Sequence, residues 1–185
     1  MAYDPKIHHR RSIRLKGYDY SRVGAYFVTI CTHKRECVFG EVVEGEMRLN
    51  ETGMIVQDEW LRTPTIRPNV ELDVFVVMPD HLQGIIILND DGRGESQFAP
   101  TRFHSPSGTV GAIVRGFKSA STKRINEIRG AIGRPLWQRN FHDRIIRDEN
   151  EMRRTQEYIV NNPLQWYYDE ERTDEQNAAS DQGFA

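Results

Sequence analysis

The chain has 185 residues, of which 38% are hydrophobic and 28% charged, and its formal net charge is −2. This length suits one domain with its own core. No apolar run is long enough to cross a bilayer and no apolar segment follows the basic residues near the start, so the sequence indicates neither a membrane helix nor a secretory signal. We expect a cytoplasmic protein without a membrane partner. Its two cysteines, Cys31 and Cys37, fit no zinc spacing and are expected to be reduced thiols.

The charge is distributed unevenly along the chain. Residues 1–16 hold five basic residues and one acidic residue, and residues 169–185 hold six acidic residues against Arg172. We therefore expect a basic arm at 1–16, a domain at 17–168 and an acidic, disordered tail at 169–185. The charge of +3 left on residues 1–168 permits a nucleic acid as partner, although a solvated terminus explains the basic arm equally well.

Hydrophobic patterning and turn residues predict strands and helices in a mixed order. The expected elements are a strand at 24–32, a β-hairpin at 38–50, a helix at 51–62, strands at 70–79 and 82–88, a helix at 109–129, a strand at 141–146 and a helix from 148 to 162. Asn50 and Asp148 are the expected N-caps of the first and last helices. Pro64 and Pro68 are expected to close the first helix, and Pro163 is expected to end the last. Residues 89–108 lack periodicity and are rich in turn formers, which predicts a long surface loop.

This order of elements predicts the fold class. The connections between several strands are too short for parallel crossovers, and the helices are few enough to cover one face of a sheet. We therefore predict an α+β fold, a ferredoxin-like sandwich whose antiparallel β-sheet carries its helices on one face.

Two pairs of polar side chains could form a site. His81 and Gln83 lie two residues apart in an expected strand, so they share one face, and Tyr158 and Asn162 lie four apart in the last helix. If that helix crosses the strand, an imidazole, two carboxamides and a phenol meet, and such groups can ligate a divalent metal of the Mg²⁺ or Mn²⁺ class. Each residue also has a structural explanation, since a histidine can end a strand and a tyrosine can pack in a core.

Several segments, taken in order, carry a resemblance to a known family. They are "RRSIRLKGYDYSRVGAYFVTICT", "VVMPDHLQGIII", "VGAIVRGFKSASTKRIN", "LWQRNFHDRIIRDENE" and "EYIVNNPLQW". Over about residues 10–168 the chain resembles the REP-associated tyrosine transposases, a branch of the single-tyrosine HUH transposases of insertion sequences.

The resemblance implies a DNA transposase with an HUH endonuclease fold that nicks and rejoins single-stranded DNA, often beside a hairpin. It implies a nucleophile, Tyr158, that forms a 5′-phosphotyrosine, and a metal, Mg²⁺ or Mn²⁺, held by His81, Gln83 and Asn162. No nucleotide cofactor is needed for such a reaction, and the chain has no glycine-rich phosphate loop.

One position departs from the family pattern, because Gln83 stands where the second histidine of the motif would be. A carboxamide oxygen is a legitimate but uncharged ligand, so we expect weaker metal binding, and Asp80 could compensate by ligating the metal or by orienting His81. Three functions therefore stay open: an active transesterase, a catalytically inactive derivative that binds DNA, and a domain that binds a small molecule or protein.

The expected DNA contacts are basic residues on three segments. They are Arg10, Arg11, Arg14 and Lys16 on the arm, Arg115 and Lys118 on the helix at 109–129, and Arg139 before the strand at 141–146. The resemblance leaves both a monomer and a homodimer open, since in related transposases a partner can supply the tyrosine helix.

Overall fold

The computed structural model describes residues 22–90 and 108–169. The basic arm, residues 91–107 of the expected loop, and the acidic tail beyond Asp169 lie outside the described residues. Four strands form the main sheet: β1 (Gly24–Cys31), β4 (Val70–Met78), β5 (His81–Leu88) and β6 (His142–Ile146). Their order is β4-β5-β1-β6, and every pair of neighbours is antiparallel.

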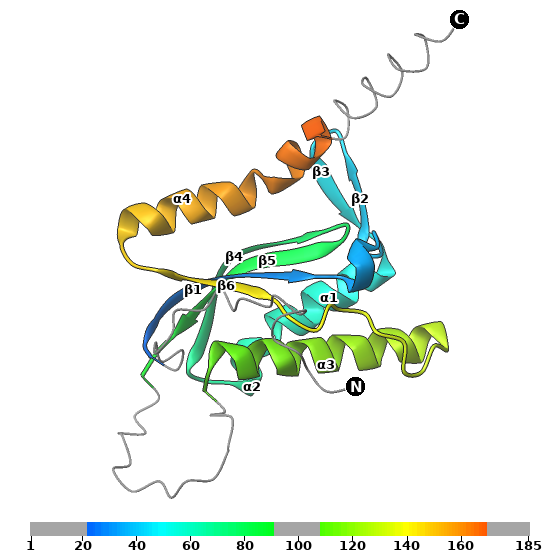
Figure 1. Ribbon diagram of the computed structural model, residues 1–185, viewed down its shortest axis with the longest axis horizontal. Helices are drawn as coiled ribbons and strands as arrows, with labels where there is room; N and C mark the ends of the chain where they lie inside the picture. The colour runs from blue at the N-terminus through cyan, green and yellow to red at the C-terminus, as the bar shows by residue number, and fades with distance from the viewer. Residues whose placement is uncertain (1–21, 91–107, 170–185) are drawn as a thin grey trace, which may run out of the picture.

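Two long helices, α1 (Glu51–Leu61) and α3 (Val110–Arg129), pack together on one face of this sheet (Figure 1). With the strands they give the β-α-β-β-α-β order of a ferredoxin-like fold, so the predicted fold, with helices packed on one face, is confirmed. The additional carboxy-terminal helix α4 (Glu149–Val160) lies on the opposite face.

Smaller elements complete the described part of the chain. They are the 3₁₀ turn η1 (His33–Arg35), the two-stranded hairpin β2 (Gly40–Val43) and β3 (Glu46–Leu49), and the short helix α2 (Thr63–Ile66). Within the described residues, none of the helices is both long and apolar enough to cross a membrane.

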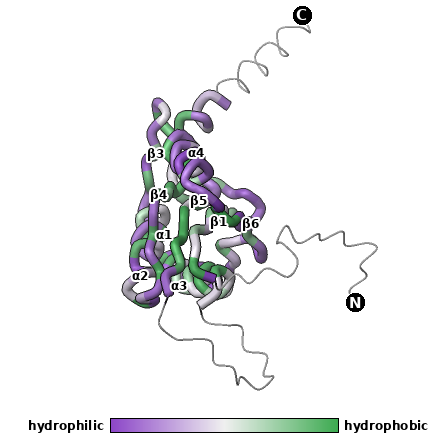
Figure 2. The backbone as a smooth tube through the Cα atoms, turned by 90° about the vertical axis from the view of Figure 1, so that its left-hand side faces the viewer, coloured by the Kyte–Doolittle hydropathy of each residue, from purple (hydrophilic) through white to green (hydrophobic). Residues whose placement is uncertain are grey.

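The strands are hydrophobic on both faces because both faces are covered. Figure 2 shows the central strands as the most hydrophobic part of the tube and α4 as mostly hydrophilic. Leu82 and Ile86 of β5 point into the larger core beneath α1 and α3, whereas Ile85 packs against Ile159 of α4. Gly84 belongs to the larger core, where a Cβ atom would lie 2.8 Å from the Cβ atom of Phe75 and 3.1 Å from the Trp60 ring.

Helices α1 and α4 end at Leu61 and Val160, close to the expected ends, but the chain becomes helical again at Pro64 and at Pro163, which was not expected. Pro64 lies in the first turn of α2, and Pro163 lies in the first turn of a further helical stretch at residues 162–169. Helix α4 ends at Val160, three residues before Pro163, and the amide of Gln165 donates to the carbonyl of Asn161 at 3.0 Å. Proline is excluded from a helix interior but is favoured in a first turn, where its missing N–H needs no partner.

Candidate active site

A row of polar side chains crosses three neighbouring strands on the α4 face of the sheet. Thr29 of β1 lies opposite Gln83 of β5 on one side and opposite His142 of β6 on the other, so the three side chains share a face. His81 lies two residues before Gln83 on that face and opposite Cys31. Gln83 and His81 are each only 5% exposed, so their polar groups require partners within the protein.

Helix α4 is held across this row by contacts along its length. Asp148 caps its start by accepting from the amide of Glu151 at 2.8 Å, as predicted for this N-cap. Thr155 accepts from Arg144 of β6 at 3.1 Å, and Gln156 donates to Asp73 at 2.8 Å, beside the bulge in β4. These contacts fix which face of α4 meets the sheet.

The carboxamide of Gln83 connects the sheet to the tyrosine helix. Its oxygen accepts from Nδ2 of Asn162 at 2.9 Å, and its nitrogen donates to the phenolic oxygen of Tyr158 at 3.4 Å, which is a long hydrogen bond. Tyr158 is 53% exposed and contacts Phe27 edge to face with ring centroids 6.1 Å apart. The structure therefore brings Tyr158, Gln83 and Asn162 together, as expected if the helix crosses the strand.

The orientation of His81 is set by a buried carboxylate. Oδ1 of Asp80 lies 2.6 Å from Nδ1 of His81, and Oδ2 accepts from Nε of Arg35 at 2.7 Å. A carboxylate only accepts, so Nδ1 carries a hydrogen, and in the neutral ring the lone pair lies on Nε2. Of the two roles considered for Asp80, its geometry matches orienting the imidazole.

The turn that delivers Arg35 to Asp80 has an unusual backbone. Lys34 and Arg35 have φ values of 57° and 61°, a left-handed conformation that costs a residue with a side chain roughly 1–2 kcal/mol. The guanidinium of Arg35 also donates to Sγ of Cys31 at 2.9 Å. The contacts made by Arg35 help to offset this strain beside the candidate site.

A cavity of about 870 Å³ opens beside these groups. Its lining includes the four expected residues His81, Gln83, Tyr158 and Asn162. A second cavity of about 680 Å³ shares His142, Arg154 and Tyr158 with it, so both cavities open at the phenol.

Several residues of this region, among them Arg35, were not identified from the sequence. Arg154 lies one helical turn before Tyr158, a spacing that could have revealed it, whereas His142 reaches the cavity only through strand pairing. Trp166 also lines the cavity, with its ring centroid 6.1 Å from that of His81. Its indole N–H is buried without a hydrogen-bond partner among the described residues.

The donor set can be tested against a divalent metal. No group of three or more His, Cys, Asp or Glu side chains in the described ranges is placed to hold one. The candidate ligands are therefore Nε2 of His81 and the carboxamides of Gln83 and Asn162, whose facing atoms are 2.9 Å apart. Rotating the Asn162 carboxamide by half a turn would bring its oxygen to this distance, and two adjacent octahedral ligands of Mg²⁺ are separated by about 3 Å. The spacing of the two carboxamides fits such a cation, but the three candidate ligands include no anionic group, which predicts weak binding.

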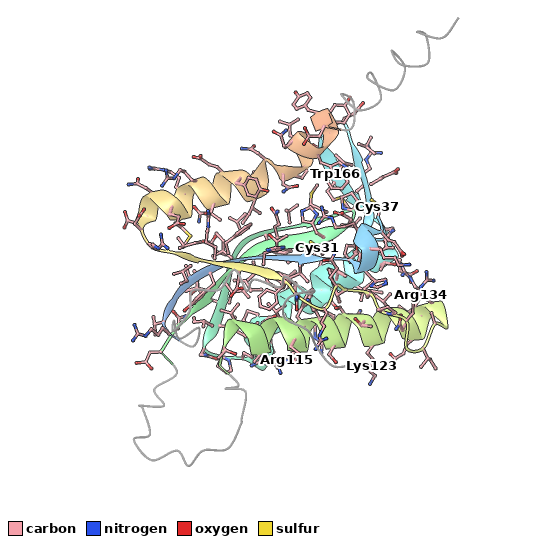
Figure 3. The ribbon with its side chains drawn as sticks, viewed as in Figure 1. Cys31, Cys37, Arg115, Lys123, Arg134 and Trp166 are labelled. Atoms are coloured by element: carbon pink, nitrogen blue, oxygen red, sulfur yellow. The ribbon has the colours of Figure 1, made fainter. Side chains whose placement is uncertain are left out.

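The expected DNA contacts on the described part of the chain lie away from this cavity. Arg115 lies on α3, on the other side of the sheet from Trp166 (Figure 3). Lys118 donates to the backbone carbonyls of Gln138 and Asn140 at 3.0 and 2.9 Å, and burial lowers its pKa to about 8 despite an opposing effect of Cys31. The ammonium group of Lys118 therefore links α3 to the segment that contains Arg139. The Arg139 side chain is exposed.

The other expected contacts on the basic arm, Arg10, Arg11, Arg14 and Lys16, lie outside the described residues. Two further tyrosines, Tyr167 and Tyr168, follow Tyr158 closely in the sequence, but neither lines the cavity. Tyr158 is thus the tyrosine that the described residues place beside Gln83.

A comparison with solved structures agrees with this fold, whereas the family models give no information about it. A scan against models of protein families finds no match. The chain is similar to the structure of a REP-associated tyrosine transposase bound to a REP hairpin, with a TM-score of 0.52 over 84% of this chain and 74% of that chain. The two sequences are 18% identical, so this likeness shows a shared fold.

A sequence relative is much more similar. An uncharacterized protein of Haemophilus influenzae (strain ATCC 51907 / DSM 11121 / KW20 / Rd) is 41% identical over 177 residues, which cover 91% of this chain and 96% of that protein. The chain therefore belongs to the same family as this Haemophilus influenzae protein.

Proposed function

We propose that the protein is a metal-dependent DNA transesterase that nicks and rejoins single-stranded DNA through Tyr158. The observation that carries this proposal is the convergence of Tyr158, Gln83 and Asn162 through hydrogen bonds beside His81, around one cavity. The REP-associated tyrosine transposase of the same fold was captured with a REP hairpin, which supports structured DNA as the substrate class.

The proposed step exchanges one phosphodiester for another. The phenolic oxygen of Tyr158 attacks the phosphorus, its proton passes to water, and a bond forms between tyrosine and the 5′-phosphate. The bond from phosphorus to the 3′-oxygen breaks, and that oxygen takes up a proton from water. Attack of a 3′-hydroxyl on the phosphotyrosine reverses the step and rejoins a strand, so no nucleotide cofactor is consumed.

The residues around the phenol have different roles in the proposed reaction. Gln83 donates toward the phenolic oxygen and stabilises negative charge as it develops there. Asp80 holds the His81 ring with Nε2 available, and His81, Gln83 and Asn162 would hold Mg²⁺ or Mn²⁺. When bound, such an ion withdraws charge from the phosphate and favours the ionised phenol.

The decisive experiment is capture of the covalent adduct. The protein is incubated with Mn²⁺ and a pool of DNA hairpins that have randomised single-stranded flanks and a label at the 3′ end, because the 5′-phosphotyrosine retains that end. We expect a labelled protein band that Tyr158→Phe abolishes. Tyr168→Phe is a matched control, since Tyr168 is 56% exposed, much like Tyr158 at 53%. An adduct that persists in Tyr158→Phe refutes the assigned nucleophile.

A second candidate function is binding of structured DNA without cleavage. Its support is the hydrogen bonding of Gln83 to both Asn162 and Tyr158, which satisfies the site with protein groups alone. Gel retention of the hairpin pool without an adduct, unchanged by a chelator, favours this function over the first.

A further inference from the structure

Arg154 lines both of the cavities that open at the phenol of Tyr158. The cavity of about 870 Å³ contains the candidate metal ligands, and the cavity of about 680 Å³ is lined mainly by residues of β6 and α4. Arg154 and Tyr158 lie four residues apart on α4, so both side chains lie on the same side of this helix. The Arg154 side chain therefore lies where the two cavities adjoin, beside the proposed nucleophile.

One hydrogen bond orients the exposed Arg154 side chain and leaves its end free. Nε of Arg154 donates to the backbone carbonyl of Asn150 at 3.2 Å, one turn earlier in α4. Among the described residues, no other hydrogen bond or ion pair engages Arg154. Its two terminal nitrogens can therefore donate together to two oxygens of one phosphate, a geometry to which the planar guanidinium is suited.

The other arginines in the two linings are already paired with carboxylates. Nε of Arg35 lies 2.7 Å from Oδ2 of Asp80, and Nε of Arg144 lies 3.4 Å from Oε1 of Glu151. No carboxylate in the described ranges pairs with Arg154, although acidic side chains also line the cavities. Arg154 is thus the arginine of these linings whose charge is available to an anion.

The composition of the candidate metal site gives this free charge a chemical role. His81, Gln83 and Asn162 include no anionic group, so we expect a metal held by them to bind weakly. Attack on a phosphodiester adds negative charge to the phosphoryl oxygens, and donors already in place for that charge stabilise the transition state. A guanidinium keeps its charge at any physiological pH and needs no bound ion, so it can supply stabilisation that the weak metal site lacks.

We propose that Arg154 binds the phosphate that Tyr158 attacks and stabilises the negative charge that develops on the phosphoryl oxygens. The assignment rests on the proposed function. Arg154 lies four residues before Tyr158 and Asn162 lies four residues after it, so the guanidinium and the candidate metal ligand lie on either side of the nucleophile along the chain. Arg154 donates hydrogen bonds and transfers no proton, so the bonds formed and broken at phosphorus are those of the proposed step.

The first test measures the rate of adduct formation with Mn²⁺ and a hairpin recovered by adduct capture. We expect Arg154→Ala to slow the reaction at least about 100-fold, and Arg154→Lys to recover only part of the rate because an ammonium group cannot contact two oxygens side by side. Arg153→Ala is the matched control and should react like the unaltered protein. Arg153 is the neighbouring exposed arginine of α4 and also bonds to Asn150, but it lines neither cavity.

The same comparison on a modified substrate separates contact with the phosphate from a structural role. A methylphosphonate at the scissile position removes one charged oxygen, so the penalty of Arg154→Ala should shrink at least about tenfold on this substrate. A penalty that stems from a distorted α4 would be the same on both substrates. Thermal melting checks that both arginine variants fold.

The second test locates the anion without requiring cleavage. Crystals are soaked in tungstate, a dianion that resembles phosphate and whose anomalous scattering marks its position. We expect tungstate within hydrogen-bond reach of the terminal nitrogens of Arg154 and the phenol of Tyr158. It should persist in Arg153→Ala and disappear in Arg154→Ala.

The outcomes separate this proposal from the proposed function. Tungstate at Arg154 in a protein that forms no adduct supports the anion site and refutes the chemistry at Tyr158. An adduct that forms equally fast in Arg154→Ala, or a penalty that is undiminished on the methylphosphonate, overturns the role of Arg154 and leaves the nucleophile in place. Tungstate that binds only elsewhere, or equally well in Arg154→Ala, also overturns it.

Discussion

The carboxylate of Asp80 allows the assigned role of His81 to be tested quantitatively. Its side chain is 4% exposed and receives two charge-assisted hydrogen bonds, from His81 and from Arg35, whose own side chain is 49% exposed. In Asp80→Asn, the carboxamide oxygen can still accept from Nδ1 of His81, and the amide nitrogen then faces Arg35, which water can solvate. Loss of charge assistance should lower the free energy of unfolding by about 1–3 kcal/mol.

The effect on metal affinity should follow the same geometry. Removing a group that orients a metal-binding histidine typically costs 10–100-fold in affinity. Asp80→Asn keeps a neutral acceptor for His81, so we expect a loss of about tenfold, or ~1.4 kcal/mol, whereas Asp80→Ala removes the acceptor and should approach about 100-fold. Mn²⁺ binding, followed by the electron paramagnetic resonance signal of the free ion, measures this without requiring cleavage.

The control for this series is Asp58→Asn, which makes the same charge change away from the candidate site. Asp58 lies on α1, on the face of the sheet opposite α4, and pairs there with Arg124 of α3. It should leave Mn²⁺ affinity within about twofold. An Mn²⁺ affinity of Asp80→Ala equal to that of the unaltered protein would show that Asp80 does not orient the His81 imidazole for metal binding.

Three further predictions concern single positions. Gln83→His should raise Mn²⁺ affinity at least about tenfold and increase adduct yield, because imidazole is the more basic ligand, and an equal or lower affinity in calorimetry contradicts the metal site. Gly84→Ala should lower the free energy of unfolding by about 1–3 kcal/mol in urea titrations, since the added Cβ atom would press on Phe75 and Trp60. The control is Gly116→Ala, whose added Cβ atom would lie 3.4 Å from the Arg67 guanidinium; Gly133 is unsuitable as a control because its φ is +82°. Burial lowers the pKa of Lys118 to about 8 in the folded state, whereas the unfolded chain keeps this proton up to about pH 10.5. The free energy of unfolding of the unaltered protein, relative to that of Lys118→Met, should therefore rise between pH 8 and 10.5. A difference that does not change with pH would refute the lowered pKa.

Much of the fold could be predicted because hydrophobic patterning reports burial directly. The β-branched residues of β4 and β5 mark strands covered on both faces, and the N-caps Asn50 and Asp148 accept from Gly53 and Glu151 as their side chains suggested. The renewed helices at Pro64 and Pro163 were not predicted, because a sequence does not say whether a proline only follows one helix or also begins the next.

The site was predictable only where its residues lie within a few positions of one another in the sequence. His81 with Gln83, and Tyr158 with Asn162, follow from strand and helix spacing within a few residues. Arg35 and His142 reach the site through a left-handed turn and through strand pairing, respectively, and neither leaves a periodic signal in the sequence. The role of Asp80 likewise depended on where Arg35 lies.

The junction at Asn161 sets how two side chains of the candidate site lie relative to each other. Tyr158 belongs to α4 and Asn162 to the following helical stretch, and both side chains hydrogen-bond to Gln83. The backbone of Asn161 is right-handed helical, its amide donates to the carbonyl of Glu157, and its carbonyl accepts from the amide of Gln165. The separation between the phenol and the Asn162 carboxamide therefore depends on this junction as well as on the packing of α4 against the sheet.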